Sequence, residues 1–211
     1  MSSNHSIGSM NQLADALDNA GFTSEDVTKL KQFGNLKAIK DLFYGRADIV
    51  MTKILELLGT VIIPATTEKF VVRDYISKLR KKRKVYTGSN FENWFFNKTV
   101  EPISKSELRY HKLRKNSVDD LIIAELGSEA KAETTLAEMF ALMQMQPNGE
   151  SGILLTNGYA NIFYVRDINS VLRVVCCRWR GGGWRVPAFP VGFPFAWDDG
   201  RQVFSRNSCE S

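Results

Sequence analysis

The sequence predicts an α+β protein in which short N-terminal helices precede a mixed middle segment and a C-terminal antiparallel β segment. Up to about residue 147, apolar side chains recur at helical spacing between residues that end helices. After residue 150, short runs rich in Val, Ile, Phe, Tyr and Trp are bounded by turn residues, which is typical of strands. A chain of 211 residues that is 44% hydrophobic can bury a core, and its size favours two or three modules.

The first 50 residues predict a small bundle of three short helices. Apolar residues keep a helical spacing over residues 13–20, and Gly21 is a residue that ends a helix at low cost. Thr23 and Asp26, three residues apart, form a variant of the capping box and predict the start of a second helix. Asn35 can cap a third helix.

Module boundaries follow from breaks in these patterns. Pro64 ends an apolar segment, residues 49–63, whose period alone assigns it neither to a helix nor to a strand. A helix is predicted over residues 132–146, with Glu133 in its first turn, where the helix dipole favours an anion. The predicted modules are a helical adaptor module (1–64), a basic mixed α/β module (65–147) and an antiparallel β recognition module (148–211).

Four strands are predicted in the last module, over residues 160–167, 172–180, 184–189 and 201–204. Tight turns are expected at 168–170 and 181–183, so that the strands form an antiparallel meander. A meander is stable when one face is covered, and the helix predicted over 132–146 is the expected cover.

Alternation along these strands separates two sets of side chains. One face carries apolar residues and is the predicted core: Val175, Cys177, Trp179, Trp184, Val186 and Ala188. The opposite face and the loop that continues it carry arginines and aromatic residues, a composition typical of binding hot spots. These candidate ligand-binding residues are Cys176, Arg178, Arg180, Arg185, Pro187, Phe189, Phe193, Phe195, Asp198, Asp199 and Arg201. The alternative is that this second face packs under another module.

Positive charge gathers in the middle of the chain. The net charge is +5, and residues 65–125 alone carry an excess of +6. Such a segment could follow a phosphate backbone while nearby aromatic residues stack on bases, although a solvated basic face is the commoner reason for such a run. The candidate nucleic-acid-binding residues lie between positions 73 and 115: Arg73, Lys78, Arg80, Lys81, Lys82, Arg83, Lys84, Lys112, Arg114 and Lys115. The neighbouring Phe91 and Trp94 to Phe96 form an apolar knot that more often fills a core.

No motif predicts catalysis. His5 and His111 have no partner at a metal-ligand spacing, and the three cysteines form neither a metal motif nor an even set for disulfides. We therefore expect a protein without a catalytic centre, metal or cofactor, with free thiols. The polar first residues do not resemble a signal peptide, and no apolar run approaches the length of a membrane span, so a cytoplasmic location is expected.

Five segments together resemble a group of uncharacterised multi-copy proteins from small-genome bacteria: residues 21–30, 45–50, 132–142, 157–164 and 202–208. The resemblance covers most of the chain and supplies no known chemistry. The C-terminal β segment of that group resembles the variable proteins of diversity-generating retroelements, which exclude Lys, Glu, Gln, Met and Trp at their varied sites. Residues 170–201 of this chain contain none of the first four residue types, and the resemblance implies that Trp179, Trp184 and Trp197 belong to the scaffold. The resemblance implies a C-type-lectin-like fold as an alternative for this part.

Two functional hypotheses follow. The first is a recognition protein that displays a diversified β surface to a ligand, expected to be a protein. The second is a nucleic-acid-associated protein that binds through residues 73–115.

Overall fold

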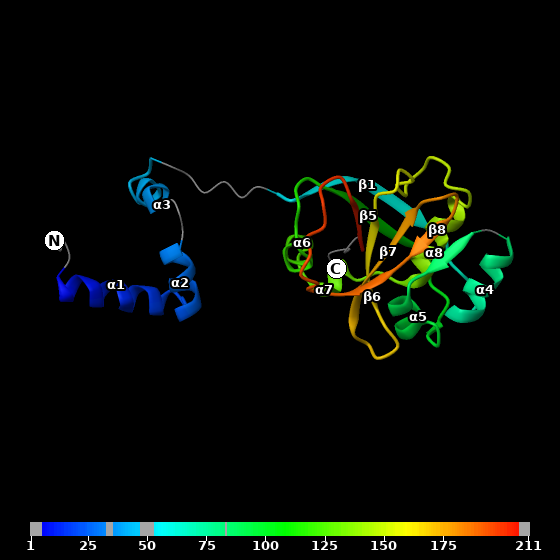
Figure 1. The fold of residues 1–211 in the computed structure, drawn as a ribbon, viewed down its shortest axis with the longest axis horizontal. Coiled ribbons are helices and arrows are strands. Elements are labelled where there is room, and N and C mark those ends of the chain that lie inside the picture. The colour runs from blue at the N-terminus through cyan, green and yellow to red at the C-terminus, as the bar shows by residue number, and fades with distance from the viewer. Residues whose placement is uncertain (1–5, 33–35, 47–52, 83, 207–211) are drawn as a thin grey trace. The chain divides into compact units, whose positions relative to one another are not determined.

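The computed structural model describes residues 6–32, 36–46, 53–82 and 84–206, and it divides the chain into two compact units, 1–51 and 52–211 (Figure 1). The division falls earlier than the Pro64 boundary expected from the sequence, because the apolar segment before Pro64 is a strand of the second unit. No helix among the described residues is long and apolar enough to cross a membrane.

The first unit contains three helices, α1 (Ile7–Asn19), α2 (Ser24–Gln32) and α3 (Leu36–Phe43). The capping box is confirmed. The Thr23 N–H and hydroxyl donate to Asp26 Oδ2 at 2.9 and 2.7 Å, and the Asp26 N–H donates to Thr23 Oγ1 at 3.2 Å. Gly21 has a φ of 79°, as expected after α1. Asn35 lies outside the described residues. No described side chain of this unit is buried, so the expected bundle shows no core there.

The second unit is built on one large mixed sheet in the order β1-β5-β10-β6-β7-β8-β3. Its strands are β1 (Leu55–Ile63), β3 (Val85–Thr87), β5 (Ser106–Leu113), β6 (Asn161–Arg166), β7 (Leu172–Trp179), β8 (Trp184–Val186) and β10 (Gln202–Arg206), and β9 (Ala188–Pro190) also pairs with β7. A separate ribbon joins β2 (Phe70–Val71) to β4 (Thr99–Val100). The predicted α+β class is confirmed.

Helices cover both faces of this sheet. α4 (Val72–Lys82), α5 (Ser89–Phe95) and α8 (Leu136–Met145) bury their apolar sides in a first core, which includes Phe163, Val175 and Cys177. α6 (Asp119–Leu126), α7 (Glu129–Ala132) and the segment 189–197 cover a second core, which includes Tyr164 and Cys176. In Figure 1, α6 and α7 lie apart from α4 and α5. Residues of the predicted middle and C-terminal modules therefore share one sheet and two cores.

The helix predicted from residue 132 begins later. α8 starts after Thr135, whose Oγ1 accepts the Glu138 N–H at 3.2 Å while Glu138 Oε2 accepts the Thr135 N–H at 2.7 Å. Glu133 is extended, bridges to Tyr164 in the sheet and accepts a hydrogen bond from Arg166 Nε at 3.0 Å. The stronger capping signal at Thr135 therefore sets the helix start, and the placement of Glu133 in a first turn was wrong. The expectation that this helix covers the β segment is confirmed.

The predicted meander is confirmed for β6, β7 and β8, which pair antiparallel in sequence order. The third predicted strand is interrupted at Pro187, which has no N–H for the ladder, so β8 and β9 pair with β7 separately. β10 departs from the meander, because it pairs parallel with β6 and antiparallel with β5.

Candidate functional site

The two faces of the C-terminal strands are only partly as the alternation predicts. The predicted core face is confirmed for five of its six residues, whereas Trp179 is only half-buried. The five buried residues are Val175, Cys177, Trp184, Val186 and Ala188. The other face was expected to be open, but Cys176 is only 1% exposed and Phe189 packs against the second core. The physical reason is the cover supplied by α6, α7 and the segment 189–197, which the alternation of one strand cannot reveal.

This cover ends before the edge of the sheet, where a row of polar side chains crosses three strands. Arg178 of β7 is the direct partner of Arg185 of β8, and Arg185 is the direct partner of Tyr86 of β3. The Arg185 guanidinium lies 4.9 Å from the centroid of the Tyr86 ring. Like charges placed directly opposite each other destabilise a sheet, so the Arg178–Arg185 pair favours an anion between or beside the two guanidinium groups.

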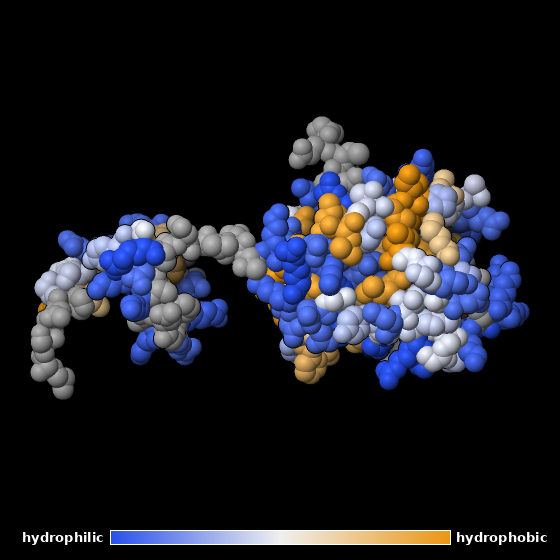
Figure 2. Space-filling view, turned by 90° about the horizontal axis from the view of Figure 1, so that it is seen from above, coloured by the Kyte–Doolittle hydropathy of each residue, from blue (hydrophilic) through white to orange (hydrophobic). Residues whose placement is uncertain are grey.

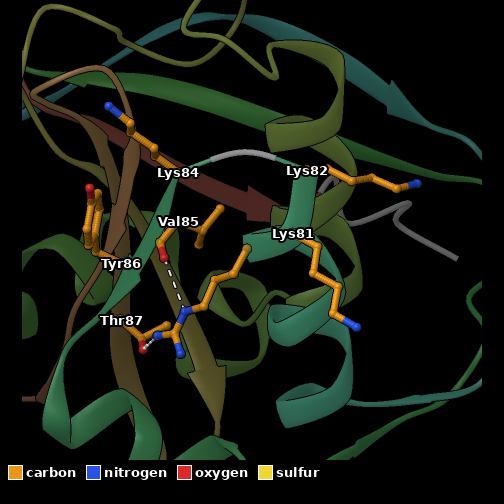
Figure 3. Close-up of a pocket in the computed structure, with 7 residues that line it drawn as sticks. Lys81, Lys82, Lys84, Val85, Tyr86 and Thr87 are labelled. Atoms are coloured by element: carbon orange, nitrogen blue, oxygen red, sulfur yellow. Dashed lines mark hydrogen bonds between the residues drawn. The ribbon is translucent and has the colours of Figure 1, made fainter.

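A second row of basic residues lies beside the first. The Arg180 N–H donates to the Gly183 carbonyl at 3.0 Å, and the Trp184 N–H donates to the Lys84 carbonyl at 2.9 Å, which places the β7–β8 turn against Lys84. Lys84 and Tyr86 flank the buried Val85, and Figure 3 shows their side chains on one side of β3. We call Lys84, Tyr86, Arg178, Arg180 and Arg185 the cationic sheet end.

The charge of the cationic sheet end is not balanced by nearby acids. None of its four cations takes part in an ion pair among the residues that the structure describes. Arg178 is half-buried, and its Nε is buried without a hydrogen-bond partner in the described part of the chain. A desolvated, unpaired donor of this kind is costly unless a ligand accepts from it.

Arg80 is held by its neighbours and differs from the lysines around it. Its Nε donates to the Val85 carbonyl at 3.2 Å, and its terminal NH2 donates to Thr87 Oγ1 at 2.6 Å and to Glu92 at 3.3 Å. Arg80 therefore joins the end of α4 to β3. A hollow of about 560 Å³ lies over this joint, lined by Arg80, Lys81, Lys82, Lys84, Val85, Tyr86 and Thr87. Lys81 and Lys82 point away from Lys84 and Tyr86 (Figure 3).

The remaining basic candidates do not form one surface with these residues. Four strands lie between β3 and β5 in the sheet, and Lys112 lies on β5. Arg114 and Lys115 follow β5, and Arg114 forms an ion pair with Glu56 at 3.3 Å. Arg73 and Lys78 are exposed on α4, and Arg83 lies outside the described residues.

The aromatic knot predicted near the basic run offers little ring surface for stacking on bases. Phe91 and Phe95 are fully buried in the first core. Trp94 is half-buried, with the Arg173 guanidinium 4.1 Å from its ring centroid. The alternative that this knot fills a core is confirmed for Phe91 and Phe95. Tyr86, which is 45% exposed, was not predicted as a site residue, and its alternation with Val85 is the signal that could have found it.

The rest of the predicted ligand set lies along the segment that covers the second core. Phe193 and Phe195 are exposed, and the Phe193 ring lies tilted between Phe189 and Phe195, with ring centroids 5.7 and 5.3 Å away. The structure places Pro187 half-buried, Asp199 exposed, and Arg201 over the Trp197 ring and paired with Asp198.

The buried thiols do not suggest catalysis. Burial raises the pKa of Cys176 to about 12, although Arg178 and Arg201 oppose the shift, and burial also raises the pKa of Cys177. Both thiols are free and stay protonated at neutral pH, whereas a nucleophilic cysteine needs a lowered pKa. Among the described residues, no group of His, Cys, Asp and Glu could hold a metal ion.

Gly183 brings the turn and β3 together. A Cβ atom added at Gly183 would lie 2.6 Å from the Lys84 carbonyl oxygen, closer than real contacts allow. We expect Gly183→Ala to push the β7–β8 turn away from β3 and to lower the free energy of unfolding by about 1–3 kcal/mol. Urea denaturation of the variant measures this change. A free energy of unfolding equal to that of the original protein would contradict the close approach.

Comparison of the chain with protein-family models, with curated proteins and with solved structures found no match. The resemblances stated from the sequence therefore stay predictions.

Proposed function

We propose that the protein binds nucleic acid through the cationic sheet end, with the phosphate backbone as the feature recognised. The direct Arg178–Arg185 pair carries this proposal, since two unpaired guanidinium groups in one register row fit phosphate oxygens well. Lys84 and Arg180 extend the positive surface. The proposed site therefore combines Arg178, Arg180 and Arg185 from the predicted ligand-binding set with Lys84 from the predicted nucleic-acid-binding set.

The geometry favours contacts to the backbone over reading of bases. The Arg185 guanidinium covers one face of the Tyr86 ring, so only the other face could stack on a base. Phosphate contacts give affinity that is independent of sequence and falls steeply with salt. We therefore expect weak sequence preference and strong salt dependence.

A charge-matched pair of triple variants tests the proposal. Lys84→Ser, Arg180→Ser and Arg185→Ser together should weaken binding of a labelled random duplex at least about tenfold and reduce the slope of log affinity against log salt by about 0.9 for each phosphate that the variant no longer binds. Fluorescence anisotropy at several KCl concentrations measures both quantities.

The control removes the same charge elsewhere, with Lys112→Ser, Lys115→Ser and Lys131→Ser. Its affinity and slope should stay close to those of the original protein, because Lys112 lies on β5, Lys115 follows β5 and Lys131 lies on α7, and none of them lines the hollow beside Lys84. Equal reductions in affinity in the two triple variants would mean that only net charge matters, and an unchanged affinity in the first would place binding elsewhere.

Recognition of a protein ligand by a diversified C-terminal surface remains a second proposal. The observation in its favour is the aromatic pair Phe193 and Phe195, with Phe195 72% exposed, because exposed aromatic residues are frequent at protein interfaces. The burial of Cys176 removes one position from that surface. Phe195→Ser separates the two proposals, since it should leave the affinity for the duplex unchanged.

A further inference from the structure

β1 forms one edge of the large sheet. Among the strands that the structure describes, it pairs with β5 alone, and its nine residues make it much longer than β3, the three-residue strand at the opposite edge. An edge strand presents a row of backbone N–H and C=O groups that can pair with another strand. The length of β1 makes this row long enough for a specific contact.

Hydrogen bonds at the start of β1 show which backbone groups point outward. The Arg114 N–H donates to the Ile54 carbonyl at 2.8 Å, and backbone groups of an antiparallel strand alternate between its two sides. The backbone groups of Leu55 therefore point away from β5, and the Leu55 N–H donates to the Glu125 carboxylate at 2.9 Å. With the register shift between Leu57 and Gly59, the same alternation directs the groups of Thr60 and Ile62 outward, where no described residue bonds to them.

Three of the four exposed side chains of β1 are apolar. Leu57, Leu58 and Ile62 are 55%, 47% and 54% exposed, the fourth is Thr60, and Glu56 carries the one charge of the strand. Figure 2 views the protein from above Figure 1, toward the side of the second unit where β1 runs, and hydrophobic residues gather there on the surface. Isolated edges are normally protected by lysines, prolines or short length. β1 has only the irregularity next to Leu58.

We propose that β1 pairs antiparallel with β1 of a second copy of this chain, about a twofold axis at Thr60. This register sets Leu58 of one copy opposite Ile62 of the other, and cross-strand apolar pairs stabilise sheets. It also sets Glu56 opposite Pro64, so no like charges meet. The strand is therefore self-complementary, as a twofold contact requires, and the two large sheets become one continuous sheet.

Two β1 variants test the contact in the full chain. Thr60→Pro removes an outward N–H, which an edge strand tolerates, and Ile62→Lys places a charge opposite Leu58 of the second copy. We expect the original protein to be a dimer in light scattering after gel filtration, and each variant to raise the dimer dissociation constant at least about 100-fold. Leu121→Lys is the matched control, because Leu121 is 57% exposed on α6 and should leave the dimer intact.

Hydrogen exchange distinguishes this contact from association through the N-terminal helices. When the protein concentration is raised, the backbone amides of residues 60 and 62 should exchange more slowly in the original protein. In Ile62→Lys, their exchange rates should not depend on concentration. An original protein that stays monomeric up to its highest soluble concentration would overturn the proposal, because a dimer must become populated as the concentration rises. So would a dimer that persists in both β1 variants while they keep the circular dichroism spectrum of the original protein.

Discussion

Replacing Trp184 by alanine is expected to lower the free energy of unfolding by about 3–5 kcal/mol. Trp184 is fully buried in the first core, where its ring meets Trp179 edge to face with centroids 5.4 Å apart. Its Nε1 donates to the Gln146 carbonyl at 3.1 Å, so the indole also joins the end of α8 to β8. The variant would leave a large cavity and remove that hydrogen bond. Urea denaturation followed by circular dichroism measures the destabilisation.

The control for this prediction is an aromatic side chain at the same strand joint on the other face. Tyr86 partners Arg185, the neighbour of Trp184, but is 45% exposed and leaves no cavity when truncated. Tyr86→Ala should therefore change the free energy of unfolding by about 0.5 kcal/mol or less. Similar destabilisation of the two variants, or a change below about 1 kcal/mol in Trp184→Ala, would contradict the assignment of the two faces.

Local signals allowed much of the fold to be predicted. The Thr23–Asp26 capping box and the three N-terminal helices depend on residues a few positions apart. The antiparallel strands β6 and β7 depend on the turn between them, where Ser170 takes a φ of 62°. Alternation then identified Trp184 and Val186 as buried. Each of these features is fixed by nearby sequence.

Long-range pairing could not be predicted in the same way. β3 lies beside β8, with Val85 paired to Trp184 across about a hundred residues, and no short-range pattern sets this register. The same pairing brings Lys84 beside Arg180 and Arg185. From the sequence, Lys84 was predicted in the nucleic-acid-binding set and the two arginines in the ligand-binding set. β1 is a similar case, because the period of residues 49–63 alone did not identify an edge strand.

The segment 189–197, which covers part of the second core, is the other feature that could not be predicted from the sequence. Asp119 holds this segment in place. Asp119 is 2% exposed, and its carboxylate accepts hydrogen bonds from Trp197 Nε1 at 2.8 Å, the Tyr164 hydroxyl at 3.0 Å and the Gly192 N–H at 3.2 Å. Burial raises the pKa of Asp119, and these three donors oppose the shift. Two of the donors belong to the covering segment, so one carboxylate links it to α6 and β6.

Asp119→Ala is therefore expected to lower the free energy of unfolding by about 2–4 kcal/mol, because it leaves the donors of Tyr164, Trp197 and Gly192 without their acceptor. Asp120→Ala is the matched control. Asp120 lies in the same first turn of α6 but is exposed, so both variants remove an acid from that turn while only one releases the covering segment. Urea denaturation of the two variants gives the comparison, and equal destabilisation would assign the effect to the helix end.

The adjacent thiols report where the structure opens in Asp119→Ala. Cys176 lies in the second core, under the segment that Asp119 holds, whereas Cys177 lies in the first core, on the opposite face of β7. Release of the covering segment should therefore expose Cys176 to a maleimide reagent well before Cys177, and tandem mass spectrometry separates the two labelled positions. Equal labelling of both thiols would mean that the variant unfolds globally, and slow labelling of both would mean that the segment stays closed without Asp119.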